Sequence, residues 1–185
     1  MNKKIILASA SPRRRELLTQ IGLDFDVVVS ETEEKINSTE PAKVVEELSA
    51  QKAEAVWEKL AVSGVFDPEQ KSGEATMTDT LVLGADTVVA CDGKILGKPA
   101  DSEAAAAMLT MLQGRGHEVY TGVTILYEQN GERKTLTFHE KTIVHFYPMT
   151  DAQIREYVAT GDPMDKAGSY GIQGFCARYI RGIEG

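Results

Sequence analysis

The chain has 185 residues and a mass of 20.2 kDa, which is enough for one domain with a hydrophobic core and too little for several. Apolar residues make up 42% and charged residues 26% of the sequence, which excludes an intrinsically disordered chain and a collagen-like repeat. The net charge of −8 argues against a general nucleic-acid-binding protein, because binding to a polyanion depends on basic surface.

Nothing in the sequence indicates a membrane segment or a secretion signal. No apolar run reaches the roughly 20 residues that a membrane-spanning helix needs, and the apolar stretch after Met1 is too short for a signal peptide. Cys91 and Cys176 are far apart in the sequence, which favours buried, reduced thiols over a zinc site or a redox pair. We therefore expect a cytoplasmic protein with no membrane partner.

The first third of the chain alternates strand and helix patterns. It predicts a strand over 5–8, a helix over 12–20, a second buried strand over 25–29 and an amphipathic helix over 41–60. Ser11 followed by Pro12 is typical of a helix start. We expect Leu17, Leu18 and Ile21 to form the apolar side of the first helix.

The rest of the chain contains clear turn and cap signals. Residues 63–80 have no period and predict an exposed loop, and 81–91 predict a buried strand that turns back at Asp92-Gly93. Ser102 is expected to cap a helix that ends near Gly114, and a hairpin is expected around Asn130-Gly131. A capping box at 150–153 predicts a last helix, followed by a glycine-rich segment and a final strand.

The junction between the first strand and the first helix is basic. Ser9 and Ser11 precede three successive arginines, of which Arg13 and Arg14 come first. A helix N-terminus carries partial positive charge, so arginines there are unfavourable unless an anion binds. Either this is a phosphate-binding corner or the arginines pair with surface acids.

Two charged residues lie within apolar patterns. Asp86 interrupts the apolar run 81–91, where a carboxylate is costly unless it is paired, binds a metal or lies at a cleft. Lys52 lies on the apolar stripe of the helix 41–60, between Leu48 and Val56. Asp86 is therefore a candidate general base or metal ligand, with a strand-end carboxylate as the alternative. Lys52 is a candidate anion-binding group, with a side chain that snorkels to water as the alternative.

Further candidates lie in flexible or acidic segments. Lys98 and Lys166 are placed among small residues that would let a phosphate approach the backbone, although tight turns explain those glycines equally well. The acids Glu31, Glu33, Glu34 and Asp86 are of the type that Mg²⁺ or Mn²⁺ prefers, and the acidic run could equally be a solvated loop.

Taken together, these motifs resemble one family. The chain resembles the Maf proteins, the septum-formation-inhibitor-like nucleoside triphosphate pyrophosphatases, in order from about residue 5 to 185. The motifs that carry the resemblance are Ser9-x-Ser11-Pro12-Arg13-Arg14, Ser30-Glu31-x-Glu33-Glu34, Gln51-Lys52-Ala53, Gly84-Ala85-Asp86-Thr87, Gly97-Lys98-Pro99, and Asp165-Lys166-Ala167-Gly168-x-Tyr170-Gly171-Ile172-Gln173-Gly174.

The resemblance implies a fold and a reaction. The fold is α/β, with a mixed twisted sheet, flanking helices and two lobes around a central cleft in a single domain over 1–185, related to the inosine triphosphate pyrophosphatases. The reaction is hydrolysis of a nucleoside triphosphate, of the dTTP and UTP branch, to the monophosphate and pyrophosphate. A divalent metal (Mg²⁺ or Mn²⁺) is the expected cofactor, and a homodimer is the assembly that the resemblance allows.

The resemblance also assigns roles to residues. Asp86 matches the proton acceptor and, with Glu33, would hold the metal. Arg13, Thr87 and Gln173 match positions that set base specificity. The substrate-binding set that we expect is Ser9, Ser11, Arg13, Arg14, Lys52, Thr87, Lys98, Lys166 and Gln173.

Two other functions remain open at this stage. A nucleotide-binding regulator of septum formation would need no turnover, but a site that only binds a polyanion gains nothing from Asp86. A purine-specific enzyme of the related fold is disfavoured by Gln173 alone, because a glutamine amide can both donate to and accept from a pyrimidine edge.

Overall fold

A computed structural model describes residues 4–30, 33–62 and 80–185 of the chain. The chain divides into two units, which are described separately. The first comprises Met1–Asn37, Lys43–Asp86 and Gly122–His139, and the second comprises Ser38–Ala42, Thr87–Thr121 and Glu140–Gly185. The expected exposed loop over 63–80 lies outside the described residues except for Thr80, and Glu31 lies outside them as well.

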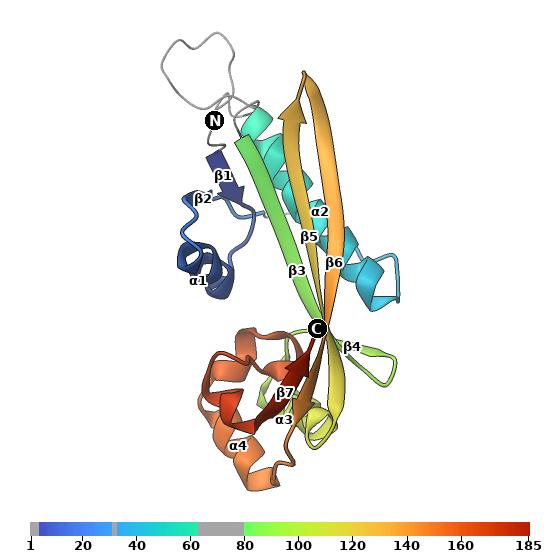
Figure 1. The fold of residues 1–185 in the computed structure, drawn as a ribbon. Helices are drawn as coiled ribbons and strands as arrows, with labels where there is room; N and C mark the ends of the chain where they lie inside the picture. Colours follow the sequence, from blue (N-terminus) through green and yellow to red (C-terminus); the bar gives the residue numbers. More distant parts are fainter. Residues whose placement is uncertain (1–3, 31–32, 63–79) are drawn as a thin grey trace. The chain divides into compact units, whose positions relative to one another are not determined.

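The fold is α/β, as expected, with a mixed seven-stranded sheet (Figure 1). The strand order is β2-β1-β3-β5-β6-β7, and β4 pairs with β3 off this path. Strand β1 is parallel to both β2 and β3, whereas β3 with β4 and β6 with β7 are antiparallel pairs. None of the described helices is long and apolar enough to span a bilayer.

The first unit is built on the N-terminal strands and one long helix. It contains β1 (Lys4–Leu7), α1 (Pro12–Gln20), β2 (Phe25–Val27) and most of α2 (Pro41–Val62), together with the first part of β3 (Thr80–Cys91). The adjoining parts of β5 (Gly116–Gln129) and β6 (Glu132–Phe146) complete it. Its core joins α2 to the strands through Ile6, Ala8, Ala53, Val56, Trp57, Leu60, Val82 and Leu126.

Two glycines allow α2 to lie directly on the strands. A Cβ atom at Gly84 of β3 would come within 2.3 Å of the Ser49 carbonyl oxygen of α2. A Cβ atom at Gly122 of β5 would come within 2.1 Å of the Val45 carbonyl oxygen. Both distances are shorter than any side chain tolerates, so only glycine permits this backbone contact between α2 and the two strands.

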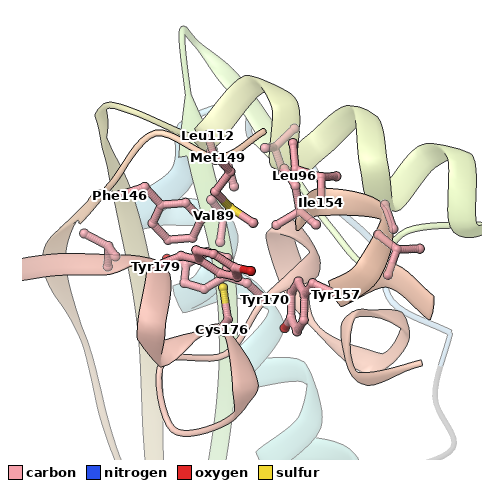
Figure 2. Packing of buried hydrophobic residues seen from close by; sticks show 14 of the residues in the cluster. Val89, Leu96, Leu112, Phe146, Met149, Ile154, Tyr157, Tyr170, Cys176 and Tyr179 are labelled. Atoms are coloured by element: carbon pink, nitrogen blue, oxygen red, sulfur yellow. The ribbon is translucent and has the colours of Figure 1, made fainter. Parts of the chain in front are cut away.

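The second unit has its own core (Figure 2). Its elements are β4 (Lys94–Leu96), α3 (Ser102–Leu112), α4 (Asp151–Ala159), three short 3₁₀ helices (η2, Asp162–Asp165; η3, Ala167–Ser169; η4, Phe175–Tyr179) and β7 (Ile180–Glu184). Phe146, Tyr170 and the ring of His117 pack edge to face, with centroids 4.8–5.3 Å apart. Both cysteines are buried and free, as predicted.

The turn and cap predictions are largely confirmed. Positive φ angles occur at Asp92-Gly93 and at Asn130-Gly131, as a two-residue hairpin turn requires. The capping box of Thr150 and Gln153 is present at the start of α4. The cap of α3 is a correction, because Asp101 accepts the hydrogen bond of the Ala104 N–H and Ser102 is the first helical residue.

Two predictions of buried segments near the N-terminus are wrong. Helix α1 has no buried residue, and Leu17 and Ile21 are exposed. Strand β2 has three residues, Phe25–Val27, and none of them is buried. Apolar residues at helical or strand spacing indicate which side would be buried, but only neighbouring elements decide whether that side is covered.

Candidate functional site

The first part of the site lies between β1 and α1, in the first unit. Ser9 is buried at the end of β1, and its Oγ accepts hydrogen bonds from the Arg14 guanidinium at 2.8 Å and from the Ser11 N–H at 3.3 Å. Ser11 occupies the N-cap position of α1, but its side chain forms no capping bond. The strand-to-helix junction therefore gathers Ser9, Ser11 and Arg14 as predicted.

Electrostatics at this junction favour an anion. Helix α1 has no acidic residue in its first turn, where Arg13 and Arg14 lie instead. Burial lowers the pKa of the Arg14 guanidinium, the charge of Asp86 opposes this, and neighbouring Arg13 lowers it further. Because positive charge is crowded beside the positive end of a helix, a bound phosphate would relieve repulsion here.

Lys52 of α2 and Asp86 of β3 form the centre of the site. The Lys52 ammonium bonds to the Asp86 carboxylate and lies 3.0 Å from the Glu34 carboxylate. The side chains of Lys52 and Asp86 are 19% and 15% exposed, so water still reaches both. Two carboxylates of the chain itself therefore pair with Lys52, and its role in binding substrate stays a prediction.

The local sequence explains why these two groups meet. Asp86 is two residues beyond Gly84, so its side chain points to the same face of β3 as the point where α2 touches the strand. Lys52 precedes Ala53, which packs against Gly84. By contrast Lys59, about two turns further along α2, is exposed, as expected of a lysine near a helix end.

The second unit holds the remaining candidates. The Thr87 hydroxyl lies 3.0 Å from that of Thr121. Lys98 is exposed, and the carbonyl of its neighbour Gly97 accepts a 3.0 Å hydrogen bond from the Gly168 N–H. The structure thus brings the Lys98 loop and the segment after Lys166 together.

Lys166 and Gln173 differ sharply in environment. The Lys166 ammonium is buried and donates to Asp162 and Asp165. Gln173 is exposed on the segment between η3 and η4. Of the two, only Gln173 has its polar group open to a ligand.

The donor chemistry of the first unit fits a divalent cation. Two carboxylates, from Asp86 and Glu34, already converge on one positive charge, and Mg²⁺ is commonly held by one or two carboxylates plus substrate phosphates. Glu33, the predicted second ligand, is exposed on the same segment. No group of three or more metal-binding side chains occurs among residues 4–30, 33–62 and 80–185.

Sequence reasoning missed some of these partners. Glu33 was predicted as the second metal ligand, whereas Glu34 is the acid that contacts Lys52. Neighbouring acids in a loop carry no period that would show which one faces Lys52. Asp162 was not singled out either, although a buried lysine four residues after an aspartate is a recognisable signal for a pair.

The chain is similar to known proteins over nearly its whole length. Residues 4–185 match the family model described as "Maf-like protein". A dTTP/UTP pyrophosphatase of Agathobacter rectalis is 53% identical over 98% of this chain and 87% of its own length. Proteins of the same name from Bacillus cytotoxicus and Pelotomaculum thermopropionicum are 47% and 46% identical, each over 99% of this chain and 85–86% of its own length.

Proposed function

Because the chain belongs to the Maf family, we propose that it is a nucleoside triphosphate pyrophosphatase that hydrolyses dTTP and UTP to the monophosphate and pyrophosphate. The observation that carries this proposal is the position of the Asp86 carboxylate, paired with Lys52 in the unit that also holds the arginines of α1. A site that only binds a polyanion is weakened by such a carboxylate, whereas hydrolysis needs one.

Asp86 has the role of general base. It accepts a proton from a water molecule as the water oxygen attacks the α-phosphorus, and the bond between that phosphorus and the α–β bridging oxygen breaks. Pyrophosphate leaves with the bridging oxygen, and Asp86 then returns the proton to solvent. Lys52 holds the carboxylate in place before the substrate binds.

The cationic side chains neutralise the triphosphate. Arg13 and Arg14 supply guanidinium groups at the helix start, Ser9 and Ser11 supply hydroxyls, and Lys98 supplies an exposed ammonium. Charge that develops on the bridging oxygen and on the leaving pyrophosphate is stabilised by such fixed cations.

A divalent cation, Mg²⁺ or Mn²⁺, is part of the proposal. Asp86 with Glu34 or Glu33 would hold it, and it would supply charge neutralisation on the phosphates and a more acidic bound water. Asp86 accepts the proton, and Lys52 positions Asp86, through their own side-chain groups.

Base selection is assigned to Gln173, Thr87 and Arg13. Uracil and thymine present an acceptor oxygen beside an N–H donor, and an amide held in one orientation can match both. Gln173 is exposed and open to such a contact. A homodimer also stays a prediction, and light scattering on the purified chain tests it.

The test is pyrophosphate release from dTTP, UTP, CTP, ITP and 7-methyl-GTP with Mg²⁺ or Mn²⁺. We expect release from dTTP and UTP, and a fall of about 10³-fold in kcat for Asp86→Asn, because general bases contribute about 10² to 10⁴. Nucleotide binding and the melting temperature of the variant should be close to those of the wild type.

The outcomes separate the hypotheses. A folded wild-type chain that binds nucleotide without releasing pyrophosphate would contradict the proposal and favour a nucleotide-binding regulator. Full activity of Asp86→Asn would remove Asp86 from the role of base. Preferential turnover of ITP would move the chain to the purine-specific enzymes.

A further inference from the structure

A buried polar network surrounds Lys166 in the second unit. Its ammonium donates to the Asp162 carbonyl at 2.5 Å, to Asp162 Oδ1 at 2.9 Å and to Asp165 Oδ1 at 2.8 Å. An ammonium group has three N–H donors, so these bonds use all of them. With its side chain 10% exposed, Lys166 has neither a donor nor much surface left for a phosphate.

Asp162 links Lys166 to Tyr157 of α4. The Tyr157 hydroxyl donates to Asp162 Oδ2 at 2.7 Å, so both carboxylate oxygens are engaged. Burial raises the pKa of Tyr157, and its bond to Asp162 raises it further, which keeps the phenol protonated. Burial disfavours the Asp162 carboxylate, but the bonds from Lys166 and Tyr157 outweigh it and lower its pKa.

The network also reaches the segment that carries Gln173. The Gly171 backbone lies close enough to the Tyr157 phenol to oppose the rise in its pKa. A Cβ atom at Gly171 would lie 3.0 Å from Lys166 Cε, and one at Gly174 would lie 3.5 Å from Asp162 Oδ2. Gly171 and Gly174, on either side of Ile172 and Gln173, therefore lie against Lys166 and Asp162.

Phe175 extends this contact. Its ring is parallel to that of Tyr157 within 3°, with centroids 5.9 Å apart. The Arg178 guanidinium also contacts Phe175 and lies 3.9 Å from its ring centroid. Gln173 itself remains exposed within this fixed frame. Its neighbours are held by these contacts, while the Gln173 amide is open to a ligand.

We propose that Tyr157, Asp162 and Lys166 form a positioning network that holds the segment 171–174 and thereby fixes the orientation of the Gln173 amide. Lys166 acts through this segment and does not contact phosphate. The proposal rests on the proposed function, because it assigns the network a part in base selection. Uracil and cytosine have donor and acceptor groups in exchanged positions on the edge that an amide contacts. An amide that can rotate by 180° fits both bases and no longer distinguishes them.

The first experiment is Tyr157→Phe, which removes one hydroxyl and keeps the ring that stacks on Phe175. We expect the ratio of kcat/KM for UTP over CTP to fall about tenfold, the size of one lost buried hydrogen bond. Inhibition by the product pyrophosphate should be unchanged. Tyr147→Phe, which removes a hydroxyl from an exposed tyrosine, is the matched control and should keep the wild-type ratio.

A second readout does not depend on turnover. Hydrogen exchange at the Gly174 amide, which donates to the Gly171 carbonyl, should become at least tenfold faster in Tyr157→Phe, because the bond from Tyr157 to Asp162 is gone, and should not change in Tyr147→Phe. Unchanged exchange would overturn the network. If the wild type releases no pyrophosphate from any nucleotide, the proposed function fails, while this exchange measurement still decides whether the network holds the segment.

Lys166→Met distinguishes positioning from phosphate binding. A positioning role predicts a lower UTP/CTP ratio with unchanged pyrophosphate inhibition. Equal losses for UTP and CTP together with weaker pyrophosphate inhibition would overturn it and return Lys166 to the phosphate-binding set. Lys166→Arg, which keeps the charge beside Asp162 and Asp165, covers the case in which the methionine variant does not fold, and the same two outcomes apply to it.

Discussion

Two lysines, one in each unit, have opposite relations to their carboxylate partners. Lys52 lies beside Asp86 and Glu34, two groups from different segments of the first unit. Lys166 bonds to Asp162 and Asp165, its neighbours in the sequence, and all three of its donors are used.

The difference shows how the same ion pair can serve chemistry or structure. The partners of Lys52 can be exchanged, because Glu34 is half-exposed and a phosphate can take its place. The partners of Lys166 cannot be removed without leaving its buried ammonium, which is 10% exposed, uncompensated. A lysine in a small-residue loop therefore indicates a ligand only when its donors are not already satisfied by the chain.

The strongest test of this contrast removes the lysine of the first unit. Lys52→Met should lower kcat/KM for UTP by about 10² to 10³, because one fixed cation at a reacting phosphate contributes about that much. The UTP/CTP ratio should not change, unlike in Lys166→Met. The control is Lys59→Met on the same helix, where the lysine is exposed. Equal effects at positions 52 and 59 would contradict the assignment.

A second test concerns stability in the core of the second unit. Burial, together with repulsion from His145 and Arg115, lowers the pKa of His117 to about 4. Because the unfolded chain takes up this proton below about pH 6.5 and the folded chain does so only near pH 4, stability should fall as the pH decreases through that window. The loss is about 3 kcal/mol, at about 1.4 kcal/mol per pKa unit.

Urea unfolding at pH 7 and pH 4 measures this loss. His117→Gln should show a smaller fall in the free energy of unfolding than the wild type, since glutamine does not titrate and still offers a polar partner to Tyr170, whose hydroxyl lies 2.7 Å from His117 Nε2. His139→Gln, at an exposed histidine, should behave like the wild type. A wild-type pH dependence in His117→Gln would be evidence against this origin.

A third test concerns the residue that the network of the second unit presents. Gln173→Glu should lower the UTP/CTP ratio of kcat/KM about tenfold, because the carboxylate no longer donates to the base and one hydrogen bond is lost. Its melting temperature should be unchanged, because the side chain is exposed. An unaltered substrate profile would take Gln173 out of base selection.

The smallest effect is expected at the surface. Arg115 forms a two-pronged ion pair with Asp92, at 2.6 and 2.8 Å, and both side chains are about half-exposed. Such exposed pairs contribute little to stability, because water screens them. Arg115→Ala should therefore lower the melting temperature only slightly and leave pyrophosphate release unchanged. The effects of replacing Lys52 and Lys166 can be compared with this small change.

The sequence predicted some features well because their causes are local. Asp92-Gly93, Asn130-Gly131 and the Thr150 capping box depend on a few consecutive residues, and all three are present. The position of Lys52 on an apolar stripe and of Asp86 in an apolar run correctly indicated two charges that need partners.

Other features depend on contacts between distant segments, which no local pattern records. The exposure of Leu17 and Ile21 reflects the lack of a neighbour that covers α1 among the described residues. The choice of Glu34 as the partner of Lys52 depends on how its loop passes α2. The saturation of Lys166 requires a count of its hydrogen bonds, which only a structure provides.

The contact between Gly84 and Ser49 shows that the motif Gly84-Ala85-Asp86 sets the distance between α2 and β3 as well as supplying the carboxylate. The reach of a lysine side chain is fixed, so Lys52 meets the carboxylate only while the helix and the strand stay this close. Because glycine has no side chain, Gly84 allows the shortest possible distance between the backbones of β3 and α2. Gly84→Ala, which adds one methyl group, should therefore separate Lys52 from Asp86 and inactivate the enzyme without changing any charged residue.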